Sequence, residues 1–170
     1  MKKPILYLMV GYPGAGKTTI AKLVAEATGA EHVWADWERH KMFSSPDHSE
    51  AESTALYEAL NRHVAKLLAA GKSVIFDTNF NYAADRRLLR DIAARNGAET
   101  LVIWITTPPK VARERAVHSQ IVRNGYDFTM TPEQFEQIAG HLEPPEDDEN
   151  VIKIDGTKID ADALKRQFST

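Results

Sequence analysis

The segment from Gly11 to Thr18 follows the pattern G-x-x-x-x-G-K-[ST], which is typical of a loop that binds a phosphate chain. Glycines let such a loop curl, so that successive backbone N–H groups point toward phosphate oxygens. We expect the Lys17 ammonium to bridge the β- and γ-phosphates, and the Thr18 hydroxyl to be a ligand of Mg²⁺. The residues predicted to contact the nucleotide here are Gly11, Pro13, Gly14, Ala15, Gly16, Lys17, Thr18 and Thr19. The pattern predicts that a nucleotide and Mg²⁺ bind at this loop.

Two carboxylates follow short apolar segments farther along the chain. Asp36 ends the segment "HVWAD" and Asp77 ends "SVIFD". A carboxylate close to the γ-phosphate can act as a general base for an acceptor hydroxyl, and we assign this role to Asp36. Asp77 is expected to orient Mg²⁺ through the water shell of the ion. Arg39, three residues after Asp36 on the same predicted helical face, could hold an anionic acceptor.

The residues around Asp77 argue against a hydrolase or a GTPase switch. Motor ATPases usually place Glu directly after this Asp to polarise water, whereas this chain has Thr78. The D-x-x-G switch of GTPases lacks its glycine here. The segment "TKID" at 157–160 resembles a guanine-binding motif, but too little sequence follows it for the next strand. Transfer of the phosphoryl group to an acceptor other than water is therefore the favoured reaction.

The segment "KVARERAVHSQIVR" can supply the cations that shield a phosphoryl group during transfer. Arg113 and Arg115 are two residues apart, about 200° around a helix, so only one of them can face the phosphates well. Arg123 is a further candidate. The stretch 118–130 is predicted to be mobile and to form part of a lid spanning approximately residues 108–140, which would exclude water.

Apolar β-rich segments alternate with helical periodicities throughout the chain. Strands are expected at 5–10, 32–36, 73–77, 100–105 and 151–154. Helices are expected between and after them, including 17–27, 86–95 and one that begins with Ser49 as its N-cap. This order predicts an α/β fold: a three-layer α/β/α sandwich of the P-loop NTPase class, with a five-stranded parallel sheet in the order 2-3-1-4-5 and a helical lid. We expect residues 1–170 to form a single domain.

The composition excludes several other classes of protein. The 170-residue chain has no Cys and a net charge of −3, which argues against thiolate metal sites, disulfides and a general attraction to nucleic acid. No apolar run approaches the roughly 18–20 residues of a membrane span. We expect a cytoplasmic protein without a membrane partner, and its oligomeric state is left open. The acidic segment "GHLEPPEDDEN" is interpreted as a solvated loop that would repel a long polyanion.

Three segments together resemble the polynucleotide 5′-kinase-like P-loop phosphotransferases, which include the kinase domain of phage polynucleotide kinase and bacterial kinases of unassigned acceptor. These segments are "GYPGAGKTT", "DWER" at 36–39 and "DTNFNYAADRR" at 77–87. The resemblance implies ATP and Mg²⁺ as cofactors, Asp36 as general base, Arg39 as a contact of the substrate phosphate and Arg115 as the lid arginine. Asn79 and Trp37 are further candidates for contact with the substrate. The family's second lid arginine is replaced here by Ser119.

The sequence leaves two classes of acceptor molecule open. The 5′-hydroxyl of a short nucleic acid or nucleotide is favoured by "DWER" and by Trp34, Trp37 and Tyr82, which could stack on bases. The alternative is a kinase acting on a metabolite, an antibiotic or a nucleotide sugar, similar to zeta toxins or chloramphenicol phosphotransferase. A basic stripe near Arg39 would indicate a polynucleotide, and a closed pocket would indicate a small molecule. A non-catalytic ATP-binding regulatory module is the third hypothesis.

Overall fold

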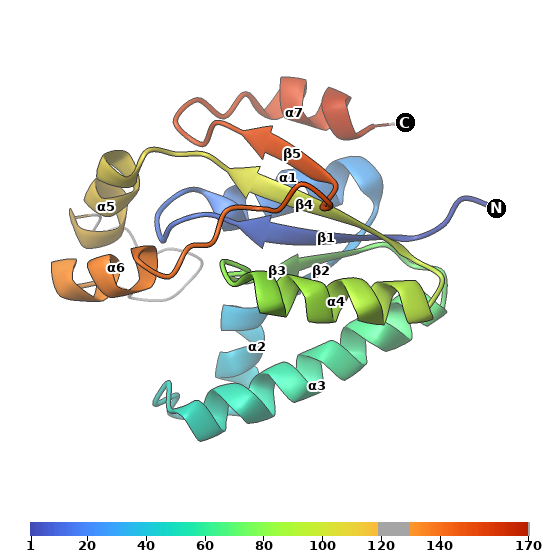
Figure 1. Cartoon of the computed structure of the whole chain (residues 1–170), viewed down its shortest axis with the longest axis horizontal. Coiled ribbons are helices and arrows are strands. Elements are labelled where there is room, and N and C mark those ends of the chain that lie inside the picture. Colours follow the sequence, from blue (N-terminus) through green and yellow to red (C-terminus); the bar gives the residue numbers. More distant parts are fainter. Residues whose placement is uncertain (119–129, 170) are drawn as a thin grey trace.

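In residues 1–118 and 130–169, which the computed structural model describes, five strands form one parallel sheet in the order β2-β3-β1-β4-β5. This is the predicted order, and Figure 1 shows the strands running side by side. The strands are β1 (Ile5–Val10), β2 (Glu31–Trp34), β3 (Val74–Asp77), β4 (Glu99–Ile105) and β5 (Val151–Ile154). The carboxyl ends of all five strands therefore lie at one edge of the sheet, opposite the two chain termini.

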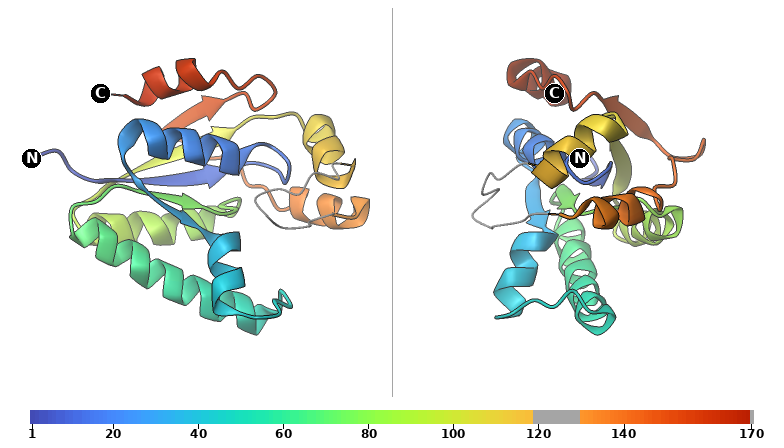
Figure 2. Two further views of the ribbon diagram at one scale, coloured as in Figure 1. Left: turned by 180° about the vertical axis from the view of Figure 1, so that it is seen from behind. Right: turned by 90° about the vertical axis from the view of Figure 1, so that its left-hand side faces the viewer.

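Helices cover both faces of the sheet. The helices of the described residues are α1 (Lys17–Thr28), α2 (Ala35–Met42), α3 (Glu50–Ala69), α4 (Ala83–Arg95), α5 (Pro109–His118), α6 (Pro132–Ala139) and α7 (Ala161–Phe168). Helices α1 and α7 lie on one face and α3 and α4 on the other, whereas α5 and α6 project beyond the carboxyl ends of the strands (Figures 1 and 2). The three-layer α/β/α arrangement is confirmed.

The pattern of β1 explains why both faces need a covering layer. Leu6 and Leu8 point into the core beneath α3 and α4, and the alternate residues Tyr7 and Met9 point into the core beneath α1 and α7. All four side chains are buried. A strand buried on both faces reads as a continuous apolar run, which is the run that precedes the glycine-rich loop.

Some element boundaries differ from the predicted ones. Strand β2 ends at Trp34, and Asp36 is the second residue of α2 rather than the end of a strand. Helix α4 begins at Ala83, three residues before the predicted start. Ser49 is the N-cap of α3, as predicted, and its hydroxyl accepts a hydrogen bond from the backbone N–H of Glu52.

The acidic segment is a largely exposed loop, as interpreted from the sequence, and ion pairs attach it to α4. We call residues 141–149 the acidic strap. In it Glu149, Glu146 and Asp148 pair respectively with three arginines of α4, namely Arg86, Arg87 and Arg90. These arginines offset part of the strap's negative charge, so its repulsion of a long polyanion is weaker than the sequence alone suggests. The hydropathy of the described helices gives no candidate that could cross a lipid bilayer.

Candidate functional site

The glycine-rich loop is shaped by close contact with the backbone of α5. Gly14 and Gly16 have φ angles of 79° and 108°, which L side chains rarely adopt. A Cβ atom on Gly14 would lie 2.3 Å from the carbonyl oxygen of Ala112 in α5. The loop therefore packs directly beneath α5 and leads into the N-terminus of α1, where the free N–H groups and the helix dipole favour a phosphate group.

Lys17, the first residue of α1, turns its ammonium group back onto the loop. Its Nζ atom donates hydrogen bonds to the backbone oxygens of Gly11 at 3.0 Å and Tyr12 at 2.8 Å. Burial lowers the pKa of Lys17 to about 8, while the charges of Asp77 and Asp36 act in the opposite direction. The three charged groups are thus near neighbours at the carboxyl edge of the sheet.

The lowered pKa of Lys17 predicts that ATP binds more weakly at alkaline pH. Only the protonated ammonium attracts phosphate, so affinity should fall as pH rises through about 8, by up to about tenfold per pH unit. Calorimetric titration of MgATP across this range measures the slope. A Lys17→Met variant, which cannot titrate at this position, should show a smaller slope. Equal slopes in the two proteins would show that another group controls binding.

Asp36 lies in the first turn of α2, directly after the edge strand β2. The residue is exposed, yet the protein atoms around its carboxyl group raise the pKa, and the negative charge of Asp77 raises it further. The positive charge of Arg39 acts in the opposite direction. An accessible carboxylate with a raised pKa is suited to accept a proton.

Asp77 ends β3 and is only 3% exposed. Its Oδ2 atom lies 2.9 Å from Nε2 of His32, a residue of the neighbouring strand β2 for which no role was predicted. The strand register pairs Asp77 with Trp34, so His32 lies two residues earlier on the same face. Only the alternation of side chains along β2, aligned with that of β3, could have indicated from the sequence that His32 lies near Asp77. Its ring fixes the orientation of the Asp77 carboxylate.

Arg39 is directed into the protein and is 6% exposed. Its Nη1 atom donates to Glu52 at 2.5 Å, and its Nη2 atom donates to Ser53 at 3.2 Å, both in α3. Among the described residues, its buried Nε atom has no hydrogen-bond partner. Arg39 is therefore buried whereas Asp36 is exposed, and an anion at Arg39 would compete with Glu52. Contact between Arg39 and substrate stays a prediction.

Aromatic rings form a ladder beside Asp36. His32 stacks on Trp34 and Trp34 stacks on Trp37, each with ring centroids 6.0 Å apart. The ammonium of Lys22 lies 5.1 Å from the centre of the Trp34 ring. Trp37, at the outer end of the ladder, is 45% exposed. An exposed ring next to the candidate base is a suitable surface for a planar group.

Tyr82, the other aromatic residue predicted to stack on bases, contacts the acidic strap. Its hydroxyl forms a hydrogen bond with the imidazole of His141 in the acidic strap, and the two rings pack edge to face. Asn79 is exposed, and its side-chain oxygen accepts a hydrogen bond from the backbone N–H of Asn81. Asn79 thus shapes the loop after β3, and its role in binding substrate stays a prediction.

Thr78, in the position where motor ATPases carry a catalytic Glu, contacts Tyr57 of α3. The two hydroxyl oxygens are 2.6 Å apart. Burial raises the pKa of Tyr57, and the charge of Asp36 contributes to this shift, which places the phenol near the candidate base. Tyr57 was missed because it belongs to a helix whose apolar periodicity suggested only a packing role.

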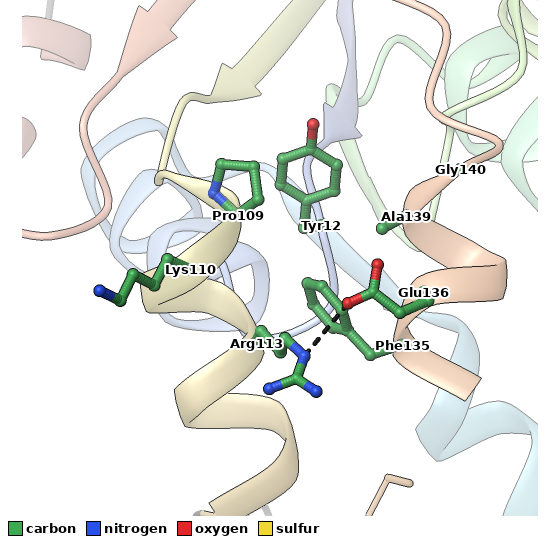
Figure 3. A pocket seen from close by; sticks show the side chains of 8 residues that line it. All are labelled: Tyr12, Pro109, Lys110, Arg113, Phe135, Glu136, Ala139 and Gly140. Atoms are coloured by element: carbon green, nitrogen blue, oxygen red, sulfur yellow. Dashed lines mark hydrogen bonds and ion pairs between the residues drawn. The ribbon is translucent and has the colours of Figure 1, made fainter. Parts of the chain in front are cut away.

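The arginines of α5 contact α6 and the loop after β5. Arg113 pairs with Glu136 of α6, with 3.1 Å between Nε and Oε1. These two residues line an open pocket between α5 and α6, together with Tyr12 of the glycine-rich loop (Figure 3). Arg115 donates from Nη1 to the backbone oxygen of Gly156 at 3.0 Å. Arg123 and most of the stretch 118–130 lie outside the described residues.

The oxygen ligands at this edge suit a hard divalent cation. Thr18 and Asp77 offer a hydroxyl and a carboxylate, which are ligand types that Mg²⁺ accepts. Within the described residues, no three His, Cys, Asp or Glu side chains gather into a potential metal site. This fits an ion that is held by one or two protein groups together with the phosphates of a nucleotide.

Over residues 6–145 the sequence matches a family described as an AAA domain. Uncharacterised proteins from Mycobacterium tuberculosis are 33% identical over 101 residues, or 52% of this chain, and the chain spans only 20% of their length. A candidate adenylate kinase from Thermococcus kodakarensis is 30% identical over 156 residues, which covers 90% of this chain and 77% of that protein. The crystal structure of a candidate kinase from Chloroflexus aurantiacus has a TM-score of 0.78 at 19% identity, covering 98% of this chain and 97% of that one.

Proposed function

The chain belongs to the AAA domain family and has a P-loop kinase-like fold, and from this premise we propose that it is an ATP- and Mg²⁺-dependent kinase with a hydroxyl acceptor. One observation carries the proposal. Lys17, Asp36 and Asp77 lie close enough for the two carboxylates to alter the pKa of the ammonium, and Asp36 is the accessible carboxylate of the pair. The lysine of the glycine-rich loop thus lies within electrostatic range of an accessible carboxylate.

The proposed reaction is an in-line displacement at the γ-phosphorus. Asp36 accepts the proton of the acceptor hydroxyl as the acceptor oxygen bonds to phosphorus. The bond between the γ-phosphorus and the β–γ bridging oxygen breaks, and ADP leaves with the electron pair. Lys17 stabilises charge on the phosphate oxygens. Thr18 and Asp77 would hold Mg²⁺, which supplies further positive charge when it is bound.

Hydrolysis is the less favoured reaction, because the position next to Asp77 has no water-activating group. Thr78 occupies that position, and its hydroxyl contacts Tyr57. A hydroxyl-bearing acceptor that binds beside Asp36 and displaces water would instead be activated directly. We further propose that residues 108–140 act as a lid over the phosphates, with Arg115, Arg113 or Arg123 as the shielding cation, and that residues 1–170 form one kinase domain.

For the acceptor, we propose the 5′-hydroxyl of a nucleotide or short nucleic acid. The exposed ring of Trp37, one residue from Asp36, supports this choice because a nucleobase can stack there while its sugar hydroxyl reaches the carboxylate. The resemblance of "DWER" and "DTNF" to polynucleotide 5′-kinases points the same way. The burial of Arg39 against Glu52 supports the second candidate, a small-molecule acceptor, because Arg39 then adds no charge to a basic surface.

A panel of acceptors tests this proposal. Wild-type protein and a Trp37→Ala variant are incubated with γ-labelled ATP, Mg²⁺ and, separately, 5′-hydroxyl oligonucleotides, nucleosides, sugars and aminoglycosides. We expect label in a nucleoside or oligonucleotide, and a KM for that acceptor about 5- to 100-fold higher in Trp37→Ala, from the loss of one stacking contact. Label in a sugar or an aminoglycoside alone would favour the second candidate. Tight ATP binding with no labelled acceptor would favour a non-catalytic ATP-binding module.

A further inference from the structure

Asn81 is a buried polar residue next to the candidate site that the proposed reaction does not use. It lies four residues after Asp77, in the loop between β3 and α4, and is 1% exposed. Its side-chain oxygen accepts a hydrogen bond from the backbone N–H of Gly11 at 3.1 Å. Its side-chain N–H donates to the backbone oxygen of Gly11, also at 3.1 Å. One amide therefore binds both backbone polar groups of the first residue of the phosphate-binding loop.

The backbone oxygen of Gly11 has a second donor, which is Lys17 at 3.0 Å. To bridge the β- and γ-phosphates, the Lys17 ammonium must turn away from this oxygen. Gly11 is buried, and a buried carbonyl left without a donor costs about 1–3 kcal/mol. Asn81 can keep the carbonyl bonded when Lys17 leaves, so the release of Lys17 becomes less costly.

From this geometry we propose that Asn81 is a positioning residue that sets the affinity of the loop for ATP, by holding Gly11 while Lys17 moves between the loop and the phosphates. The inference rests on the proposed function, since it requires that ATP binds at this loop. It concerns only binding and the placement of Lys17. Asn81 is not assigned any contact with the reacting atoms.

The position of Asn81 is itself fixed by the acidic strap. Its backbone oxygen accepts a hydrogen bond from the backbone N–H of Glu143 at 2.8 Å. The preceding residue, Phe80, accepts from Nη1 of Arg86 at 2.8 Å, and Arg86 is also paired with Glu149. The loop after β3 is therefore held between the sheet and the strap, which gives the Asn81 side chain a fixed direction toward Gly11.

The variant Asn81→Asp removes the bond to the Gly11 carbonyl. Ionised aspartate has nearly the same shape and keeps an acceptor for the N–H of Gly11, but it cannot donate to the Gly11 oxygen. It also adds a negative charge, whose effect is measured by the same substitution in a Lys17→Met background. Asn96→Asp is the matched control, because Asn96 also donates its side-chain N–H to one backbone oxygen, that of Ile92 at 2.8 Å. Asn96 is the C-cap of α4, at the opposite end of that helix from Asn81.

The experiment is a calorimetric measurement of MgATP affinity in wild type, Asn81→Asp and Asn96→Asp, with thermal unfolding to confirm that each is folded. We expect Asn81→Asp to bind about 5- to 150-fold more weakly, and Asn96→Asp to bind like wild type. The same substitution is then made in a Lys17→Met background. There the effect should shrink to less than about threefold, because no ammonium needs to leave the Gly11 oxygen.

Each other outcome counts against the proposal. Wild-type affinity in folded Asn81→Asp would overturn it, and an equal loss in the Lys17→Met background would show that Asn81 acts only by stabilising the loop. If Asn81→Asp does not fold, the side-chain N–H resonances of Asn81 are followed in wild type by NMR. They should stay protected from exchange when MgATP is added, and loss of protection would contradict the proposal. A wild type that binds no ATP would overturn the proposed function as well.

Discussion

Replacing Asp36 with asparagine should lower kcat for phosphoryl transfer by about two to four orders of magnitude, the usual contribution of a general base. Asparagine has the same shape but cannot take the proton of the acceptor hydroxyl at neutral pH. Because Lys17 and the loop glycines are unchanged, the dissociation constant of ATP should change by less than about threefold. Steady-state kinetics with the acceptor found in the panel, together with calorimetry of MgATP, measure the two effects separately.

Asp162→Asn is the matched control for Asp36→Asn. Asp162 is the second residue of α7, as Asp36 is of α2, and both are exposed acids in a first helical turn. Each substitution removes a similar favourable interaction with a helix dipole, of about 0.3–1 kcal/mol, so the two variants should have similar stability. Only Asp36→Asn should lose activity. Equal activity of Asp36→Asn and wild type would show that another group accepts the proton.

The pH profile adds a second test of Asp36. Only the deprotonated carboxylate can act as a base, and both the surrounding protein atoms and the charge of Asp77 raise the pKa of Asp36. The activity of wild type should therefore fall as pH decreases through this raised pKa, at a pH above that expected for an ordinary aspartate. The residual activity of Asp36→Asn should lack this acid limb.

Replacing Arg86 with alanine should destabilise the fold by about 3–5 kcal/mol, which would be the largest stability effect among the variants considered. Arg86 and Glu149 form a buried pair, with side-chain exposures of 1% and 6%, and an Nε–Oε1 distance of 2.8 Å. Arg86 also donates to the backbone oxygens of Phe80 and Pro144. Its removal leaves a buried carboxylate and two carbonyls with fewer donors. Denaturant unfolding followed by circular dichroism measures the change.

The neighbouring residue provides the control for Arg86→Ala. Arg87 pairs with Glu146 at 3.3 Å, but both side chains are about half exposed. An exposed pair contributes about 0–1 kcal/mol, so Arg87→Ala should have nearly wild-type stability. If Arg86→Ala were equally mild, the strap would not be anchored as the structure indicates, and the fixed position of Asn81 would need another explanation.

The fold could be predicted from the sequence because its signals are local. The apolar run of β1, the glycine-rich loop and the helical periodicity after Lys17 specify a strand, a loop and a helix in turn. Repetition of this unit leaves few arrangements other than a parallel sheet with helices on both faces. The ends of strands and helices were predicted less accurately. The end of β2 was placed two residues too late, because Ala35 and Asp36 fit either the end of a strand or the start of a helix.

Side-chain partners could not be predicted in the same way, because they come from elements that are far apart in the sequence. The spacing of Asp36 and Arg39 suggested a shared face, but Glu52 of α3 draws Arg39 into the interior. The contact of Asn81 with Gly11 joins residues 70 positions apart. The ion pairs of the acidic strap were not predicted, because its arginine partners on α4 are more than 50 residues away. Charge patterns along the chain do not reveal such partners.

The central claim is that this site transfers a phosphoryl group to an alcohol. The most direct test is to follow γ-labelled ATP in the presence of the acceptor and to count ADP, labelled phosphate ester and labelled inorganic phosphate in the same samples. We expect nearly one phosphate ester for each ADP, with little inorganic phosphate. If each ADP is matched by inorganic phosphate, and the panel of hydroxyl acceptors yields no ester, the protein is an ATP hydrolase and not a kinase.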